Sequence, residues 1–477
     1  MQPRYISAIE IGSSSIKGAV ATVDPDTGVL TVIAREQTAA AGCVRYGWIN
    51  NVEDTCRLIE ELIDRLERNP RVAPRRIRAV YVALGGRSLR SSEHEVSLRL
   101  DDERKITGDT LARLSEDARE SFVTDNEIVD IFPRRFVIDS GAITNPIGTY
   151  SKCLSATYNI VTCRPQMMRN LKRVFDALRS RIHMAGIVLR PLAEADLVLT
   201  SDDRRLGCAL VDIGSDTTSV VVYKDGVLRY LAAIPVGSHH ITRDITSLGV
   251  TIERAEAFKL NHGDAAEADP VQYNDPFAEQ AGNVVRARAG EIVANIVANI
   301  SYSGLRTADL PAGIVLVGGG SYLRNIDGLL MDESGMRVRR GRPDERVRVD
   351  ATTAVAERSV DIFSALLAGA HINTGIMCLE DPTPPVVEQP ERRTLDRDSA
   401  PQYRSAERQP SRYVADYSDD NDADLLQDDP DDEDKDIFDR PEPRRKKRSE
   451  EKPTKRGAFM QWLSNRASDL VKGPDED

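Results

Sequence analysis

The 477-residue sequence is poor in cysteine and aromatic residues and has no long apolar run. Its six cysteines are scattered, with no CxxC or Cys/His spacing, which argues against zinc and a disulfide framework and predicts reduced thiols. No stretch of about twenty apolar residues occurs, so no segment is expected to cross a membrane. Because Met1–Tyr5 leads directly into an apolar strand, no signal peptide is expected. The net charge is −12, and the apolar-rich part has no basic patch, which predicts that nucleic acid is not a partner.

A Gly-rich turn between two short apolar runs is the most informative stretch. The runs Leu206–Asp212 and Ser219–Tyr223 predict two strands. Backbone N–H groups and small hydroxyl residues in such a turn can bind phosphate oxygens. Asp212, at the end of the first strand, could hold a metal ion or its water. The alternative is an ordinary structural hairpin. The candidate nucleotide-binding residues of this second loop are Asp212, Gly214, Ser215, Asp216 and Thr217.

The same order of residues occurs near the N-terminus. An apolar strand ends at Ile11, a Gly-Ser turn follows, and a second strand runs through Gly18–Thr22. The candidate residues of this first loop are Gly12, Ser13, Ser14, Ser15 and Lys17. Lys17 is expected to reach phosphates as a point charge, the alternative being a strand lysine that faces solvent. Two such hairpins predict two related halves that face one nucleotide.

Two further segments complete the predicted nucleotide site. The strand Ile314–Val317 runs into Gly318, Gly319 and Gly320, where glycine lets adenosine approach the main chain. The predicted helix Thr251–Leu260 carries Glu256 and Lys259 about one turn apart. This pair is either a solvated ion pair worth a few tenths of a kcal/mol or a clamp on the ribose and adenine.

The predicted fold is α/β, with two ribonuclease-H-like halves around a nucleotide cleft. Strands at 5–11, 16–23 and 29–38, a helix at 52–66 and a strand at 78–84 open the first half. We predict that this half comprises residues 1–87 and 163–205, with a small α+β insertion at 88–162. The second half is predicted at 206–375, with a short edge strand at 336–342 and a helix at 361–370 that could close the hinge between the halves.

Beyond residue 380 the composition changes. Residues 380–456 are rich in proline and acidic residues and predict a disordered linker. Residues 457–472 predict an amphipathic helix that lies in a membrane interface, with anionic lipid favoured by the basic residues before it. The alternative is a helix that docks on the core or on a partner. The predicted membrane-facing residues are Phe459, Met460, Trp462, Leu463, Ala467, Leu470 and Val471.

These motifs resemble the actin-like ATPase superfamily, and the position of the insertion resembles the FtsA family of bacterial cell-division proteins. The likeness covers about residues 4–375. It is carried by Tyr5–Val20, Gly42–Val52, Val80–Arg87, Asn145–Gly148, Ile160–Cys163, Leu206–Tyr223, Ala255–Gly263 and Ile314–Leu329.

The resemblance implies an ATP-binding protein that forms filaments on the cytoplasmic face of the inner membrane at midcell. Its implied partners are a second copy of itself, anionic lipid, later division proteins and the C-terminal peptide of the tubulin-like protein FtsZ, which would dock at about residues 241–280. At most slow ATP hydrolysis is expected.

The resemblance also implies Mg²⁺, held through water by Glu10 and Asp212. The second loop departs from the family pattern Asp-x-Gly-Gly-Gly-Thr, because Ser215 and Asp216 stand at two glycines and Ser219 replaces an acid. A carboxylate close to phosphates is unfavourable unless a cation lies between them.

Two other functions fit the superfamily. A small-molecule kinase is disfavoured because the sequence shows no obvious cleft acid beyond the two loops and because a kinase does not need the terminal helix. A pilus-assembly scaffold is disfavoured by the same helix.

Overall fold

The computed structural model describes residues 4–266, 276–350, 359–372 and 375–381. Apart from Glu380 and Asp381, the predicted linker and the predicted terminal helix lie outside the described residues. Both remain predictions from the sequence.

The first half is built on a six-stranded sheet with the order β12-β7-β1-β2-β3-β18. Consecutive residues of β1 and β7 are buried, so both faces of the sheet are covered. Helix α1 packs against β2 and β3, and α10 packs against β1 and β7. The elements of this half are β1 (Arg4–Ile11), β2 (Ser15–Val23), β3 (Leu30–Ala39), β4 (Val44–Arg45), β5 (Trp48–Ile49), α1 (Val52–Arg68), β6 (Arg76–Ile77), β7 (Ala79–Leu84), α3 (Pro165–Ala177), β12 (His183–Leu189), α4 (Arg190–Val198), β18 (Val347–Val349), α10 (Val360–Ile372) and β19 (Leu379–Glu380).

Helix α1 shows how the local sequence produces this packing. Its N-terminus is capped by the Asn51 side chain, which accepts a hydrogen bond from the Asp54 amide at 3.0 Å. Its apolar residues recur at helical spacing and are buried: Leu58, Ile59, Leu62, Ile63 and Leu66. Gly18 of β2 leaves room for them, because a Cβ atom there would lie 2.9 Å from Leu66 Cδ1.

The inserted segment follows β7 in the chain and precedes α3. It comprises β8 (Arg90–Lys105), α2 (Gly108–Ser121), β9 (Glu127–Ile138), β10 (Gly141–Ile143) and β11 (Tyr150–Cys163). Its strands pair in the order β10-β9-β11-β8, and its core includes Leu114, Tyr158 and Ile160. By chain position the segment interrupts the first half, as predicted.

The second half repeats the topology of the first. Its strands follow the order β15-β14-β13-β16-β17, which matches β3-β2-β1-β7-β12 in both sequence order and strand direction. A separate core lies between its sheet and its helices. The elements are α5 (Ser201–Leu206), β13 (Cys208–Ile213), β14 (Thr218–Lys224), β15 (Val227–Ile234), α6 (Ser238–Thr246), α7 (Ile252–His262), α8 (Pro276–Tyr302), β16 (Gly313–Val317), the 3₁₀ turns η2 (Thr307–Asp309) and η3 (Gly319–Tyr322), α9 (Ile326–Ser334) and β17 (Val338–Arg340).

One sheet contains both the inserted strands and the strands of the second half. β8 pairs with β15 at Arg90 and Ala232, which makes a nine-stranded sheet from β10 to β17. The Leu231 amide donates to Ser91 Oγ at 2.8 Å, and the Asn159 side-chain amide donates to the Leu228 carbonyl. The insertion therefore continues the sheet of the second half, a connection that the sequence did not predict.

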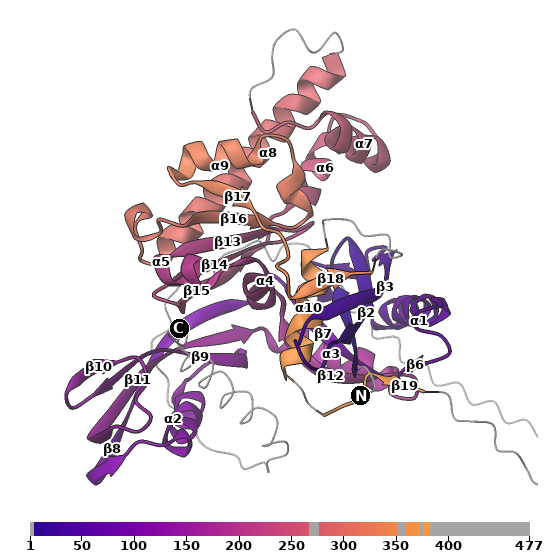
Figure 1. Cartoon of the computed structure of the whole chain (residues 1–477). Coiled ribbons are helices and arrows are strands. Elements are labelled where there is room, and N and C mark those ends of the chain that lie inside the picture. Colours follow the sequence, from indigo (N-terminus) through magenta and orange to yellow (C-terminus); the bar gives the residue numbers. More distant parts are fainter. Residues whose placement is uncertain (1–3, 267–275, 351–358, 373–374, 382–477) are drawn as a thin grey trace, which may run out of the picture. The chain divides into compact units, whose positions relative to one another are not determined.

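Further differences from the predicted elements include three that bear on the two halves. Leu206 ends helix α5, so the strand predicted from Leu206 begins at Cys208 after Gly207. Helix α6 had no predicted range. Strand β18 and helix α10 lie within the range predicted for the second half but pack on the first sheet, and Figure 1 shows both in orange beside the indigo strands β2 and β3. The predicted edge strand is present as β17.

Candidate functional site

The first candidate loop joins β1 to β2. The Gly12 amide donates to the Ser15 carbonyl at 3.1 Å, which closes the turn, and Ser13 Oγ accepts a hydrogen bond from the Gly47 amide at 3.0 Å. Glu10 and Lys17 are direct partners in the β1–β2 register. The register therefore places a buried carboxylate and an amine beside the turn.

The second candidate loop joins β13 to β14 in the same way. The Gly214 amide donates to the Thr217 carbonyl at 2.9 Å. Asp216 turns its carboxylate toward the other half: Oδ2 accepts a hydrogen bond from the Tyr46 amide at 3.1 Å. This contact gives Asp216 a structural role that links the two halves.

The Gly318–Gly320 segment lies against the second loop. Gly318 has φ +85° and ψ +164°, a conformation that essentially only glycine adopts. A Cβ atom at Gly318 would lie 2.6 Å from the Ile213 carbonyl oxygen and closer still to Asp212 Oδ1. The main chain after β16 therefore packs directly on the end of β13.

The helix pair predicted as a clamp is part of a polar cluster. Lys259 Nζ lies 2.8 Å from Glu256 Oε2 and donates to Thr242 Oγ1 at 2.9 Å. Thr242 in turn donates to Glu256 Oε2 at 2.5 Å. Burial raises the pKa of Glu256, but the hydrogen bonds from Lys259 and Thr242 outweigh it and hold the pKa below its usual range. The Lys259 side chain is 10% exposed and the Glu256 side chain is 40% exposed, so only the acid of this pair is well solvated.

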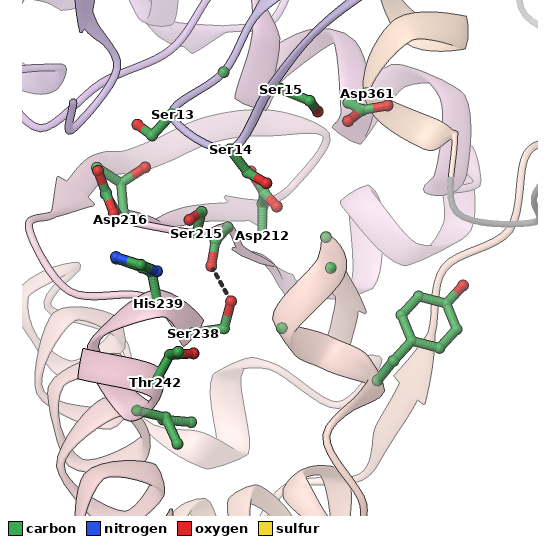
Figure 2. Close-up of a pocket in the computed structure, with 18 of the residues that line it drawn as sticks. Ser13, Ser14, Ser15, Asp212, Ser215, Asp216, Ser238, His239, Thr242 and Asp361 are labelled. Atoms are coloured by element: carbon green, nitrogen blue, oxygen red, sulfur yellow. Dashed lines mark hydrogen bonds between the residues drawn. The ribbon is translucent and has the colours of Figure 1, made fainter. Parts of the chain in front are cut away.

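These segments surround one cavity of about 680 Å³. Figure 2 shows Ser13 and Ser14 of the first loop opposite Asp216 and Asp212 of the second. The structure brings together every residue predicted for the nucleotide and metal sites; that they bind ATP remains a prediction. They are Glu10, Gly12, Ser13, Ser14, Ser15, Lys17, Asp212, Gly214, Ser215, Asp216, Thr217, Glu256, Lys259, Gly318, Gly319 and Gly320.

Several cavity residues were missed by the sequence analysis. Arg190 begins α4, Asp361 lies in the first turn of α10, and Ser238, His239 and Thr242 come from α6. The expectation that the cleft has no acid beyond the two loops was wrong, because Asp361 lines it. The sequence offers one hint of these residues: Arg190 is a charged residue directly after an apolar strand.

Charges of both signs meet at the closed end of the cavity. Lys17 forms an ion pair with Asp361 and lies 3.8 Å from Glu10 Oε2. Burial lowers the pKa of Lys17, but the carboxylates of Asp361 and Glu10 outweigh it and raise the pKa above its usual value. The predicted alternative of a solvent-facing lysine does not fit a side chain that is 19% exposed and paired in this way.

Arg190 is the centre of this charge cluster. Its Nη1 donates to Glu10 Oε1 at 3.0 Å, its Nη2 lies 2.9 Å from Asp212 Oδ2, and its Nε lies 3.7 Å from Glu194 Oε1. Burial lowers the pKa of Arg190, but Asp212, Glu194 and Glu10 raise it further than burial lowers it. Burial raises the pKa of all three acids, that of Glu194 most, and Arg190 opposes this.

This arrangement does not fit the predicted Mg²⁺ site. Arg190 forms an ion pair with one oxygen of each of the two carboxylates expected to hold the ion through water, while Glu10 Oε2 and Asp212 Oδ2 make no hydrogen bond. Separating a buried ion pair so that one charge is left alone costs about 3–5 kcal/mol.

Two halves of the same topology, each with a phosphate-type hairpin at one cavity, define an actin-like fold. Among solved structures, the PilM–PilN type IV pilus biogenesis complex is similar in fold, with a TM-score of 0.54 and 17% identity over 76% of this chain and 97% of that one. A family model for the cell division protein FtsA matches residues 209–360, and a model for the SHS2 domain inserted in FtsA matches residues 86–162.

Two curated relatives extend these matches over most of the fold. The cell division protein FtsA of Porphyromonas gingivalis is 30% identical over 332 residues, 67% of this chain and 68% of the relative. That of Escherichia coli K12 is 26% identical over 363 residues, 71% of this chain and 84% of the relative. The chain belongs to the FtsA family of cell-division proteins. No helix in the part of the chain that the structure describes is long and apolar enough to span a membrane.

Proposed function

We propose that this protein binds ATP in the cleft, polymerises on the inner membrane and anchors the FtsZ ring at the division site. The observation that carries the proposal is the single cavity of about 680 Å³ shared by the two loops and Gly318–Gly320. Family membership adds the cell-division context. The pilus-assembly alternative loses its support, because the relatives that cover most of the chain are division proteins.

Within the proposed ATP site, each segment has a separate role. The turns of the two loops offer backbone amides and serine hydroxyls to the phosphates. Lys17 supplies a point charge at the same place. Gly318–Gly320 lets adenosine approach the main chain, and Glu256 and Lys259 on α7 contact the ribose and adenine. The proposed function includes no divalent cation, since Arg190 already occupies Glu10 and Asp212.

The adaptor role rests on the C-terminal sequence. The residues predicted to face the membrane include Phe459, Trp462 and Leu463, and the segment before them is basic. A single interfacial helix binds a membrane weakly, whereas a filament that carries many binds through avidity. This argument connects polymerisation with attachment to anionic lipid. The family implies further contacts with the FtsZ C-terminal peptide, at about residues 241–280, and with later division proteins.

The ATP site can be tested by filling the cavity without disturbing the fold. Gly319 lines the cavity, and a Cβ atom there would meet no heavy atom within 4 Å. Gly319→Phe is expected to weaken ATP binding at least about tenfold, measured by calorimetric titration. Gly328→Phe is the matched control, because Gly328 is exposed on α9 outside the cavity and also has no neighbour within 4 Å. Equal ATP affinity in both variants would refute the placement of the nucleotide.

The adaptor function can be tested in dividing cells. The full-length chain and a version that ends at Arg456 are each fused to a fluorophore. A midcell ring is expected for the full-length chain, and a diffuse signal is expected for the truncated one. A diffuse signal for both proteins would contradict the division-site assignment, and a ring for both would contradict the anchor.

A further inference from the structure

A buried arginine lies where the cleft was expected to hold a metal ion. Arg190 Nη1 is 3.0 Å from Glu10 Oε1, and Nη2 is 2.9 Å from Asp212 Oδ2. The two carboxylates come from equivalent strand ends, β1 and β13, in the two halves. One guanidinium therefore bridges the pair of acids at which the two halves meet.

The other oxygen of each carboxylate also has a neighbour. Glu10 Oε2 lies 3.8 Å from Lys17 Nζ, and Asp212 Oδ1 faces the main chain at Gly318, where a Cβ atom would collide with it. Both acids are nearly inaccessible, with 2% of Glu10 and 4% of Asp212 exposed. Glu10 Oε2 and Asp212 Oδ2 nevertheless make no hydrogen bond, so Arg190 and Lys17 balance the charge of this pair without satisfying each oxygen.

The surroundings of Arg190 are shaped for a guanidinium. Gly85, at the end of β7, lies directly against it: a Cβ atom at that position would be 2.9 Å from Arg190 Nε. Any larger residue would displace the side chain. Arg190 also lies near Glu194, one turn further along α4, whose Oε1 is 3.7 Å from Nε. The guanidinium thus forms ion pairs with three acids beside a glycine that makes room for it, although its Nε makes no hydrogen bond.

A guanidinium and a hydrated Mg²⁺ differ in the space and the geometry that they need beside carboxylates. Arginine is charged at any physiological pH and matches carboxylates through its planar fork of donors. Mg²⁺ requires near-octahedral coordination and usually keeps several waters, so it needs space around the carboxylates. For an ion to bind between Glu10 and Asp212, Arg190 would have to leave its buried pocket.

We propose that Arg190 is a built-in cation that neutralises Glu10 and Asp212, so that the cleft binds ATP without a divalent ion. The inference rests on the proposed function, because it concerns the same site. Arg190 is a positioning residue in this scheme: it acts on the phosphate loops through the two acids.

The wild-type full chain provides the first test. ATP binding is measured by calorimetric titration in Mg²⁺ and in EDTA at equal ionic strength. Dissociation constants that agree within about threefold support the inference. Binding at least about tenfold weaker in EDTA overturns it while leaving the ATP site intact. No ATP binding in either buffer overturns the proposed ATP site and the inference with it.

Variants then test whether Arg190 is the reason that ATP binding does not depend on Mg²⁺. Arg190→Gln removes the charge and frees both acids, so its ATP affinity is expected to become Mg²⁺-dependent by about tenfold or more. Arg190→Lys retains the charge and is expected to remain insensitive to EDTA. Arg181→Gln is the matched control, because Arg181 also pairs with two acids, Asp64 and Glu67, but does not line the cavity. An Arg190→Gln protein that binds ATP equally in both buffers would overturn the role of Arg190.

Discussion

The floor of the cleft depends on a backbone conformation that only glycine tolerates, and this can be tested by Gly318→Ala. Alanine at φ +85° and ψ +164° is strained by about 1–3 kcal/mol. Its Cβ atom would also lie 2.6 Å from the Ile213 carbonyl oxygen, and overpacking of this kind costs about 1–3 kcal/mol. The free energy of unfolding is therefore expected to fall by about 2–6 kcal/mol.

Gly319→Ala provides the control at the next residue. A Cβ atom there meets nothing within 4 Å, and no left-handed φ is required. Its effect on the free energy of unfolding is expected to lie between zero and a gain of about 1 kcal/mol, because alanine reduces the freedom of the unfolded chain.

Both variants and the wild type are unfolded in urea and followed by circular dichroism, and their transition midpoints are compared. If Gly318→Ala and Gly319→Ala had the same midpoint, the close packing of Gly318 on Asp212 and Ile213 would be refuted. The contact of the Gly318 main chain with Asp212 Oδ1 would then no longer be part of the charge cluster.

Two further predictions concern stability and membrane binding. The buried Glu67 accepts hydrogen bonds from Ile77 N at 2.8 Å and Arg181 Nη2 at 2.9 Å, so Glu67→Gln is expected to cost about 1–3 kcal/mol at pH 7. Burial raises the pKa of Glu67, but its arginine partners outweigh burial and hold the pKa below 4.5. The stability lost in Glu67→Gln should therefore shrink as the pH falls below 4.5. Urea midpoints of wild type and variant between about pH 3 and 7 measure this, and a difference in midpoint that stays constant with pH would contradict the argument. Trp462→Glu is expected to abolish co-sedimentation with anionic vesicles, whereas Gln461→Glu on the predicted polar face should not; continued binding of Trp462→Glu would show that another surface contacts lipid.

Much of the fold could be predicted from the sequence because its signals are local. Helix α1 and the hairpins β1–β2 and β13–β14 are encoded by the spacing of apolar residues within a short stretch. Helix α5 could have been predicted as well, because Thr200 and Asp203 form a capping box in which each side chain binds the other's amide. Its polar residues carry no apolar periodicity, so the start of the following strand was misplaced.

The pairing of distant strands could not be predicted in the same way. Strand β18 has only three residues, and it joins β3 across roughly 300 positions of chain. The ladder between β8 and β15 has one residue pair, Arg90 and Ala232, supported by the hydrogen bond from the Leu231 amide to Ser91 Oγ. Such short contacts leave no periodic pattern in the sequence.

The same difference between local and distant signals explains what was missed in the site. Each phosphate loop is one continuous stretch of chain, so its turn between two strands can be predicted from the order of its residues. Arg190 is 180 positions from Glu10, and Asp361 is 344 positions from Lys17, yet these pairs decide the charge at the end of the cleft. Each long-range partner lies within the first two residues of a helix, α4 or α10. Helix α10 packs on the first sheet, and α4 packs on α10 and contacts β12 and β14. These helices thus bring an arginine and an aspartate to the two loops. The proposed ion preference of the cleft rests on that packing, whereas Mg²⁺ was implied by the resemblance to the family.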